Sequence, residues 1–173
     1  MASMIGCTIR AATTGDASAI AAIYAHYVRT STATFELHPP SAVEMGRRMT
    51  AIYDLGLPYL VAEHQDRLLG YAYAAQFRPR PAYRFSVENS VYVDADHLRK
   101  GIGNQLLKPL IEDCNKAGAR QMIAAISGDN PASIALHTTF GFTHVGILRS
   151  VGFKLEQWLD VTLMQRALRL EPR

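Results

Sequence analysis

The 173-residue sequence has only two cysteines, Cys7 and Cys114. Their spacing matches neither a metal-ligand motif nor the framework of a disulfide-rich domain, and such usage is typical of a reducing cytosol. No apolar run approaches the roughly 20 residues that cross a bilayer. The N-terminus lacks the apolar core and the cleavage site of a signal peptide. These absences predict a cytoplasmic protein without a metal site or a membrane segment.

Strong charge is also missing. The formal net charge is +3, the isoelectric point is about 9.0, and no run of Lys and Arg exceeds two residues. A nucleic-acid-binding surface is therefore not indicated. With 49% hydrophobic and 19% charged residues, the composition is typical of globular proteins. We expect a single domain over residues 1–173, with an extension at 1–6 and a tail at 167–173.

The most informative motif is a basic loop with two glycines, Arg99-Lys100-Gly101-Ile102-Gly103-Asn104, which follows a strand pattern and opens a helix. Unpaired N–H groups at a helix start bind phosphate-like anions, and glycines let a ligand approach the backbone. The motif is not a P-loop, because no Lys-Ser or Lys-Thr pair follows the glycines. It is not a dinucleotide fingerprint either, because the third glycine would fall at Leu106. An ordinary helix start would explain the loop equally well.

Strand and helix patterns alternate along the chain, which predicts one α/β domain with a mixed sheet and helices on both faces. Capping signals at Ser41 and Asn130 mark two of the helix starts. The predicted strands are 7–11, 59–63, 68–77, 85–93, 121–127, 143–151 and 157–165. The predicted helices are 16–30, 41–55, 102–117 and 131–141.

A glutamate in the middle of a predicted central strand needs an explanation. Glu88 shares one face of the strand with Ser86, Ser90 and Tyr92. The opposite face consists of Phe85, Val87, Asn89, Val91 and Val93. A buried carboxylate is costly unless it is paired or hydrated. Glu88 is therefore either an outward-facing residue with a cationic neighbour or a general base in a cleft, where burial raises its pKa.

His137 lies seven residues after Asn130, about two helical turns along, so both project from the same side of the helix. Asn130 needs no role beyond capping that helix. A single helical histidine is more often a surface or core residue than a catalytic one. The pattern alone leaves the structural and the catalytic interpretation of His137 open.

Together, five segments resemble the GNAT superfamily of N-acetyltransferases and, within it, the phosphinothricin acetyltransferase-like amino-acid N-acetyltransferases. The resemblance runs from Thr8 to about Leu168, with the segments in the family's order and at its spacing. They are TSTATFE (30–36), LGYAYAAQFRPRPAYRFSVENSVYV (69–93), HLRKGIGNQLL (97–107), DNPASIALHTTFGF (129–142) and GFKLEQWLDVTLMQ (152–165). The resemblance implies a GNAT-type fold, whose mixed sheet is mostly antiparallel, and a homodimer.

The resemblance also implies acetyl-CoA as the acetyl donor, with its pyrophosphate on the amides of the loop from Arg99 to Asn104. The positions that match contacts to the pantetheine arm are Val91, Tyr92, Val93, Asn130 and Ser133. Leu98 is a departure, because the superfamily usually has Gln or Arg there. Since the loop binds mainly through its backbone, we expect little loss of binding.

For the chemistry, Glu88 matches the family's proposed general base. His137 stands where many GNAT enzymes have a tyrosine near the thioester sulfur and phosphinothricin-type members have histidine. The positions that match the acceptor pocket are Phe35, Tyr73, Arg78, Arg80 and Tyr83. Arginine suits this site because it can bind a carboxylate or phosphinate with two parallel hydrogen bonds.

The resemblance thus implies acetylation of the α-amine of a small amino acid, such as phosphinothricin or methionine sulfone or sulfoximine, by direct attack on acetyl-CoA. Such an activity would confer resistance to herbicides and antibiotics of this kind. Two alternatives stay open. One is an acetyltransferase for protein N-termini or other amines, and the other is a non-catalytic sensor that binds acyl-CoA.

Overall fold

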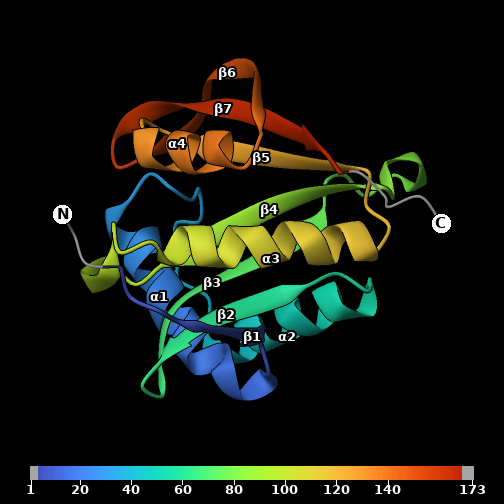
Figure 1. The fold of residues 1–173 in the computed structure, drawn as a ribbon. Coiled ribbons are helices and arrows are strands. Elements are labelled where there is room, and N and C mark those ends of the chain that lie inside the picture. Colours follow the sequence, from blue (N-terminus) through green and yellow to red (C-terminus); the bar gives the residue numbers. More distant parts are fainter. Residues whose placement is uncertain (1–3, 169–173) are drawn as a thin grey trace.

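A seven-stranded sheet forms the centre of the computed structural model, which describes residues 4–168 (Figure 1). Its spatial order is β1-β2-β3-β4-β5-β7-β6. The strands are β1 Thr8–Ala11, β2 Tyr59–His64, β3 Arg67–Gln76, β4 Ser86–Val93, β5 Gln121–Ser127, β6 Thr143–Lys154 and β7 Gln157–Ala167. Every neighbouring pair is antiparallel except β4 and β5. The prediction of a mixed, mostly antiparallel sheet is confirmed.

Strands β4 and β5 pair over only a short stretch. Their parallel register joins Ser86–Glu88 to Gln121–Ile123 and stops there. On their outer sides, β3 stays paired with β4 as far as Val93, and β7 with β5 as far as Ser127. The two central strands therefore separate after Glu88 and leave a fork in the middle of the sheet (Figure 1).

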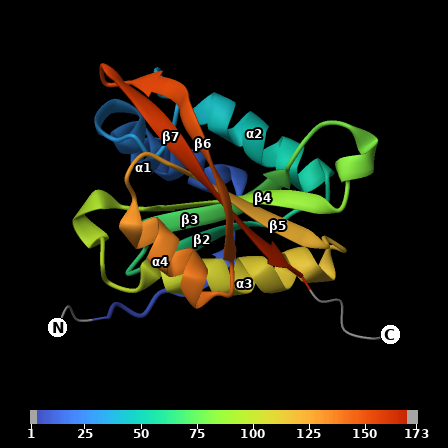
Figure 2. The same cartoon turned by 90° about the horizontal axis from the view of Figure 1, so that it is seen from above.

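Helices cover both faces of the sheet, as predicted. They are α1 Ala17–Thr30, α2 Ala42–Asp54, α3 Ile102–Lys116 and α4 Pro131–Thr139. Helices α1 and α2 lie on one face and α3 on the other (Figure 2). Each face has its own core: Tyr59 and Tyr71 pack toward α1 and α2, whereas Leu60 and Ala72 pack toward α3. This alternation along β2 and β3 is the two-residue period of a strand buried on both faces.

Local signals in the sequence account for several element ends. The Ser41 hydroxyl accepts a hydrogen bond from the Glu44 N–H at 3.1 Å and caps α2, as predicted. The Glu44 carboxylate binds the Arg48 guanidinium at 2.9 Å instead of returning to Ser41, so only half of a capping box forms. Gln65 and Asp66 have φ of 49° and 61° and form the two-residue turn between β2 and β3.

The C-terminal hairpin is longer than predicted. Strand β6 ends at Lys154 rather than Val151, and β7 at Ala167 rather than Gln165. Two register shifts in β6 interrupt the alternating pattern, which explains why the strand looked shorter in the sequence. Residue 167 therefore belongs to the sheet and Leu168 is buried. The rest of the predicted tail and positions 1–3 of the predicted extension lie outside the described residues.

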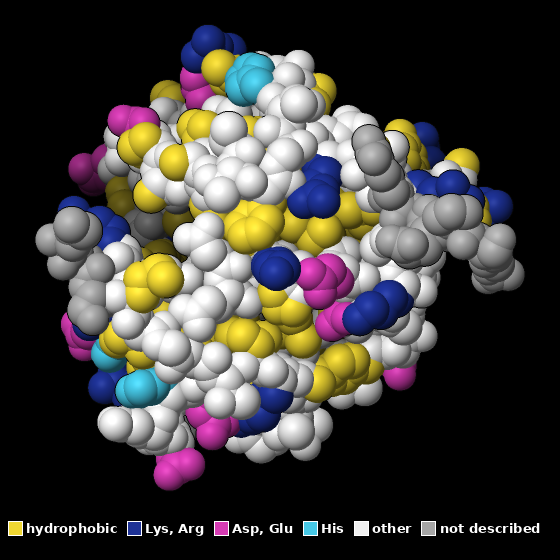
Figure 3. Space-filling view, in the orientation of Figure 1, with side chains coloured by type: hydrophobic (Ala, Val, Ile, Leu, Met, Phe, Trp, Pro, Cys, Tyr) yellow, Lys and Arg dark blue, Asp and Glu magenta, His cyan; other side chains and the backbone are white. Residues whose placement is uncertain are grey.

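The surface combines charged and apolar side chains. On the face that carries α3, acidic and basic side chains are interspersed with apolar ones (Figure 3). Exposed apolar side chains gather on the β6–β7 hairpin and comprise Val145, Ile147, Leu148, Val151, Phe153, Leu155 and Trp158. Among residues 4–168, no helix is long and apolar enough to cross a membrane. Cys7 and Cys114 are free thiols.

Candidate active site

A cavity of about 1340 Å³ opens at the fork between β4 and β5. At one end it is lined by the glycine loop and the start of α3, and at the other by the loop that joins α1 to α2. The predicted site residues that line it are Phe35, Tyr73, Glu88, Val91, Tyr92, Val93, Arg99, Gly101, Ile102, Gly103, Asn104, Asn130, Ser133 and His137. The structure thus brings together residues that are up to about a hundred positions apart in the chain.

Glu88 is the last residue of β4 that pairs with β5, so its side chain lies at the base of the fork. The side chain projects from the face that also carries Tyr92, as predicted, and it is partly buried. Burial raises the pKa of the Glu88 carboxyl above its usual range, and the positive charge of Arg78 opposes that shift. A carboxylate with a raised pKa in a cavity has the properties of a general base.

The backbone of β4 presents hydrogen-bonding groups to the cavity. Two hydrogen bonds show which β4 residues bond to β3: the Phe77 N–H donates to the Ser86 carbonyl, and the Asp94 N–H donates to the Leu69 carbonyl. In this register the even-numbered residues of β4 bond to β3, and the odd-numbered residues turn their N–H and C=O groups away from β3. Since β5 no longer pairs with β4 beyond Glu88, these groups of Val91 and Val93 face the fork. The Val93 carbonyl accepts a hydrogen bond from the Tyr27 hydroxyl, and its N–H remains directed at the fork.

The glycine loop turns sharply into α3. Gly101 precedes the helix with φ of 79°, a left-handed conformation that glycine adopts without strain. The helical bonding begins with the Gln105 N–H, which donates to the Gly101 carbonyl at 3.2 Å. The preceding N–H groups in the first turn have no partner within the helix, and no side chain caps them. Lys100 does not line the cavity, because its amine donates to the Asp96 carbonyl at 3.0 Å.

His137 is buried, with 4% of its surface exposed. Its Nε2 lies 2.9 Å from Asn89 Oδ1, and its Nδ1 lies 2.8 Å from the Ser133 carbonyl and 3.4 Å from the Ser133 hydroxyl. Burial lowers the pKa of the imidazole, so the neutral ring is favoured. Asn89 Oδ1 and the Ser133 carbonyl can both only accept, so each ring nitrogen faces an acceptor and the single N–H of the neutral ring donates to one of them. These contacts hold the ring in the wall of the cavity.

Asn89 is a site residue that sequence reasoning missed. It is buried, with 6% exposed, and its Nδ2 donates to the Ile123 carbonyl of β5 at 3.1 Å. Together with the contact to His137, it ties β4, β5 and α4 together at the base of the fork. The signal was available, because Asn89 is the single amide on a strand face that otherwise carries apolar residues.

The end of the cavity that contains Phe35, a predicted acceptor residue, is built on the α1–α2 loop, whose residues 31–36 all line it. The Thr32 carbonyl accepts a hydrogen bond from the Ser127 hydroxyl at 2.6 Å. The Thr34 carbonyl accepts one from the buried Lys154 amine at 2.7 Å. Phe35 lies against Gly152, where a Cβ would be 2.3 Å from its ring, so the close approach requires glycine. The loop is therefore attached to both β5 and β6, although no sequence motif indicated this.

Three predicted acceptor residues lie outside the cavity lining. Arg78, Arg80 and Tyr83 are exposed on the β3–β4 loop. Arg78 lies close enough for its charge to act on Glu88, and its guanidinium stacks 5.0 Å from the Phe77 ring centre. Among residues 4–168, no group of three or more His, Cys, Asp or Glu side chains is arranged to hold a metal ion.

Known proteins share this architecture. The chain is 51% identical to phosphinothricin N-acetyltransferase of Alcaligenes faecalis, with 94% of this chain and 83% of the relative covered. It is 39% identical to the L-methionine sulfoximine/L-methionine sulfone acetyltransferase of Salmonella typhimurium, covering 93% and 94%. A crystal structure of a GNAT superfamily phosphinothricin acetyltransferase from Sinorhizobium meliloti, in complex with acetyl-CoA, superimposes with a TM-score of 0.92 at 45% identity, covering 95% and 89%.

A family model described as an acetyltransferase (GNAT) domain matches residues 9–163. The match spans the forked sheet, Glu88 and the glycine loop together, so the relationship includes the whole cavity and not only one motif. The resemblance that the sequence suggested is thereby confirmed, and the chain belongs to the GNAT acetyltransferase family.

Proposed function

We propose that the protein transfers an acetyl group from acetyl-CoA to the α-amine of a small amino acid, such as phosphinothricin, methionine sulfone or methionine sulfoximine. The observation that carries the proposal is Glu88, a carboxylate with a raised pKa at the base of the fork. It lies in the same cavity as a helix start with unpaired N–H groups. The names of the relatives support the same reaction and the same class of acceptor.

The cavity has the donors that acetyl-CoA needs. The first turn of α3 offers the N–H groups of Ile102, Gly103 and Asn104 to a pyrophosphate, and Arg99 adds positive charge. The outward groups of Val91 and Val93 can pair with the amides of the pantetheine arm as an added strand would. Asn130 and Ser133 line the wall beside that path.

The chain's own residues can perform the proton transfers. Glu88 accepts a proton from the α-ammonium, directly or through one water, and the free amine attacks the acetyl carbonyl. A backbone N–H of β4 near Val93 that faces the fork and is not paired with the pantetheine arm is suited to stabilise the oxyanion that develops. The CoA thiolate then leaves and takes a proton from His137, which lines the cavity, or from water.

The acceptor would bind between the α1–α2 loop and the β3–β4 loop. Phe35 and Tyr73 form walls of the cavity there, and Tyr83 packs edge-on against Phe77 at 5.8 Å. Arg78 and Arg80 are the basic residues placed to bind the α-carboxylate, provided that their loop closes over the acceptor. Both side chains are exposed in this structure, so this binding requires the loop to move toward the cavity.

Release of CoA measured against a panel of amines tests the proposal. The panel contains amino acids, short peptides with a free N-terminus, and polyamines. We expect turnover with amino acids only. Faster turnover with peptides or polyamines would favour the alternative of a different amine acceptor. Binding of acetyl-CoA without turnover on any amine would favour the non-catalytic sensor.

We also propose a homodimer with two-fold symmetry, assembled through the exposed apolar face of the β6–β7 hairpin. Trp158 is 67% exposed and contacts Phe153 at 5.2 Å between ring centres, so the pair presents a broad aromatic surface. Light scattering at micromolar concentration should give twice the chain mass. The substitution Trp158→Lys should shift the population toward the monomer. A fully active wild-type monomer would contradict the proposal.

A further inference from the structure

The acceptor end of the cavity carries two carboxylates and no basic side chain. Among the described lining residues, the side chains with a full charge are Glu36, Glu88, Arg99 and Asp129. Arg99 and Asp129 belong to the glycine loop and to the segment before α4, where acetyl-CoA is proposed to bind. Glu36 and Glu88 remain at the acceptor end. Glu88 has a place in the proposed chemistry, whereas Glu36 so far has none.

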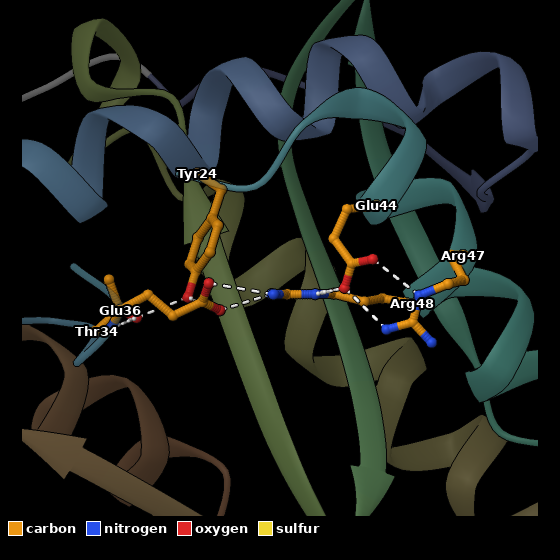
Figure 4. Close-up of polar contacts among 6 residues, drawn as sticks. All are labelled: Tyr24, Thr34, Glu36, Glu44, Arg47 and Arg48. Carbon is orange, nitrogen blue, oxygen red and sulfur yellow. Dashed lines mark hydrogen bonds and ion pairs between the residues drawn. The ribbon is translucent and has the colours of Figure 1, made fainter. Parts of the chain in front are cut away.

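Glu36 is held in a fixed position by three hydrogen bonds (Figure 4). The Arg48 guanidinium donates to both carboxylate oxygens, at 2.6 and 3.2 Å, and the Tyr24 hydroxyl donates to one of them at 3.0 Å. Arg48 also donates to Glu44 at 2.9 Å from its Nε. Arg48 therefore has two carboxylate partners, of which Glu36 lines the cavity and Glu44 does not.

Tyr73 lines the cavity together with Glu36 and the proposed general base Glu88. Burial raises the pKa of the Tyr73 hydroxyl most, the charges of Glu88 and Glu36 add smaller increases, and the charge of Arg48 opposes them. An amino acid whose α-amine lies at Glu88 would extend its side chain past Tyr73 toward Glu36. The head group of that side chain would then meet a carboxylate.

We propose that Glu36 makes the acceptor site selective for amino acids with an uncharged side-chain head group over those with an anionic one. The proposal rests on the proposed amino-acid acetylation. Like charges a few ångströms apart in a partly desolvated site repel each other, and such repulsion is a common source of specificity. Arg48 offsets part of the negative charge but stays behind Glu36, outside the cavity lining.

A pair of acceptors that differ in the charge of the head group tests the role of Glu36. Methionine sulfone and phosphinothricin have similar length and a similar methyl-bearing tetrahedral head group, but only the head group of phosphinothricin is negatively charged. The measured quantity is the ratio of their kcat/KM values, which is independent of the amount of folded enzyme. For the wild type we expect the sulfone to be preferred, and we expect the preference to shrink as salt is added.

The variant Glu36→Gln keeps the size and polarity of the side chain and removes its charge. It should shift the ratio toward phosphinothricin by about tenfold, the effect of a screened like-charge contact. Glu44→Gln is the matched control, because it removes the other carboxylate of Arg48 outside the cavity, and it should leave the ratio nearly unchanged. Arg48→Met exposes the full charge of Glu36 and should shift the ratio in the opposite direction, further toward the sulfone.

The failure of this inference is distinguishable from failure of the proposed function. A wild type that prefers phosphinothricin, or a ratio that is equal in the wild type and Glu36→Gln, would overturn the role of Glu36 while amino-acid acetylation stands. Equal shifts in Glu36→Gln and Glu44→Gln would also overturn it, because the effect would then come from Arg48 alone. No turnover of either amino acid, with acetyl-CoA bound, would reject the proposed function and this inference together.

Discussion

The two ends of the cavity are built from different parts of the chain. The end proposed to bind the pyrophosphate of acetyl-CoA presents backbone groups of one contiguous loop and helix start, with Gly101 in a left-handed conformation that glycine adopts without strain. The end proposed to bind the acceptor is lined by side chains from the α1–α2 loop, β3 and β4, and its loop is held by Arg48 and Lys154 from two further elements. A backbone cradle should tolerate changes of side chain, as we expect at Leu98, whereas a site made of side chains should change its preference through a single charge.

The largest effect on turnover should come from substituting Glu88, which lies where the two ends of the cavity meet. Glu88→Gln should lower turnover by roughly 10²–10⁴-fold, the usual share of a general base. Acetyl-CoA affinity, measured by calorimetry, should not change, because the cofactor end is independent of the Glu88 carboxylate. Turnover near the wild-type level at neutral pH would show that Glu88 is not the general base.

The pH dependence sharpens the same prediction. Glu88 must be ionised to accept a proton, so kcat/KM should fall as the pH drops through its pKa. Since burial raises that pKa, the fall should occur at a higher pH than for an exposed glutamate. The acid limb should be absent from the profile of Glu88→Gln. A limb that persists in this variant would belong to another group.

At the acetyl-CoA end, Gly103→Val should raise the dissociation constant of acetyl-CoA by about 10–100-fold, the cost of losing a charge-assisted hydrogen bond. A Cβ at Gly103 would lie 3.3 Å from the tip of the Leu136 side chain, which can move, so the fold should tolerate the change. Gly6→Val is the control, because a Cβ there meets nothing within 4 Å. Unchanged affinity by calorimetry would contradict the assignment of the loop.

At the acceptor end, Arg80→Ala should reduce the preference for an amino acid over its decarboxylated analogue, again by about 10–100-fold in kcat/KM. Acetyl-CoA affinity should stay constant. Arg84→Ala is the control from the same loop, because its guanidinium stacks on Phe85 at 4.4 Å. If the wild type acetylates the decarboxylated amine as efficiently as the amino acid, arginine does not bind the α-carboxylate.

The smallest effect on turnover is expected at the base of the fork. Asn89→Ala removes the hydrogen bonds to the Ile123 carbonyl and to His137, and leaves these buried groups unpaired. The free energy of unfolding, measured by urea titration, should fall by about 1–3 kcal/mol. Turnover should fall less than in Glu88→Gln, since Asn89 acts only through the position of its neighbours. Unchanged stability would show that Asn89 and His137 do not hold the fork together.

Local patterns predicted most of the elements because their causes are local. Strand β5 matches its predicted range, and α2 begins at the cap that Ser41 indicated. The end of β6 was placed too early, because the bulges that carry the strand on to Lys154 depend on its pairing with β7. The contacts of Asn89 and Glu36 were not foreseen, because their partners His137 and Arg48 come from other elements.

The sequence by itself determined the alternation of strands and helices, the two faces of β4, and the glycine loop before α3, since each follows from neighbouring residues and backbone preferences. It also carried the family resemblance. Only the tertiary structure decided that β4 and β5 separate after Glu88, and that the α1–α2 loop closes the acceptor end through Lys154 and Arg48. The physical reason is that a cavity and its charges are set by contacts between segments far apart in the chain, which no local pattern records.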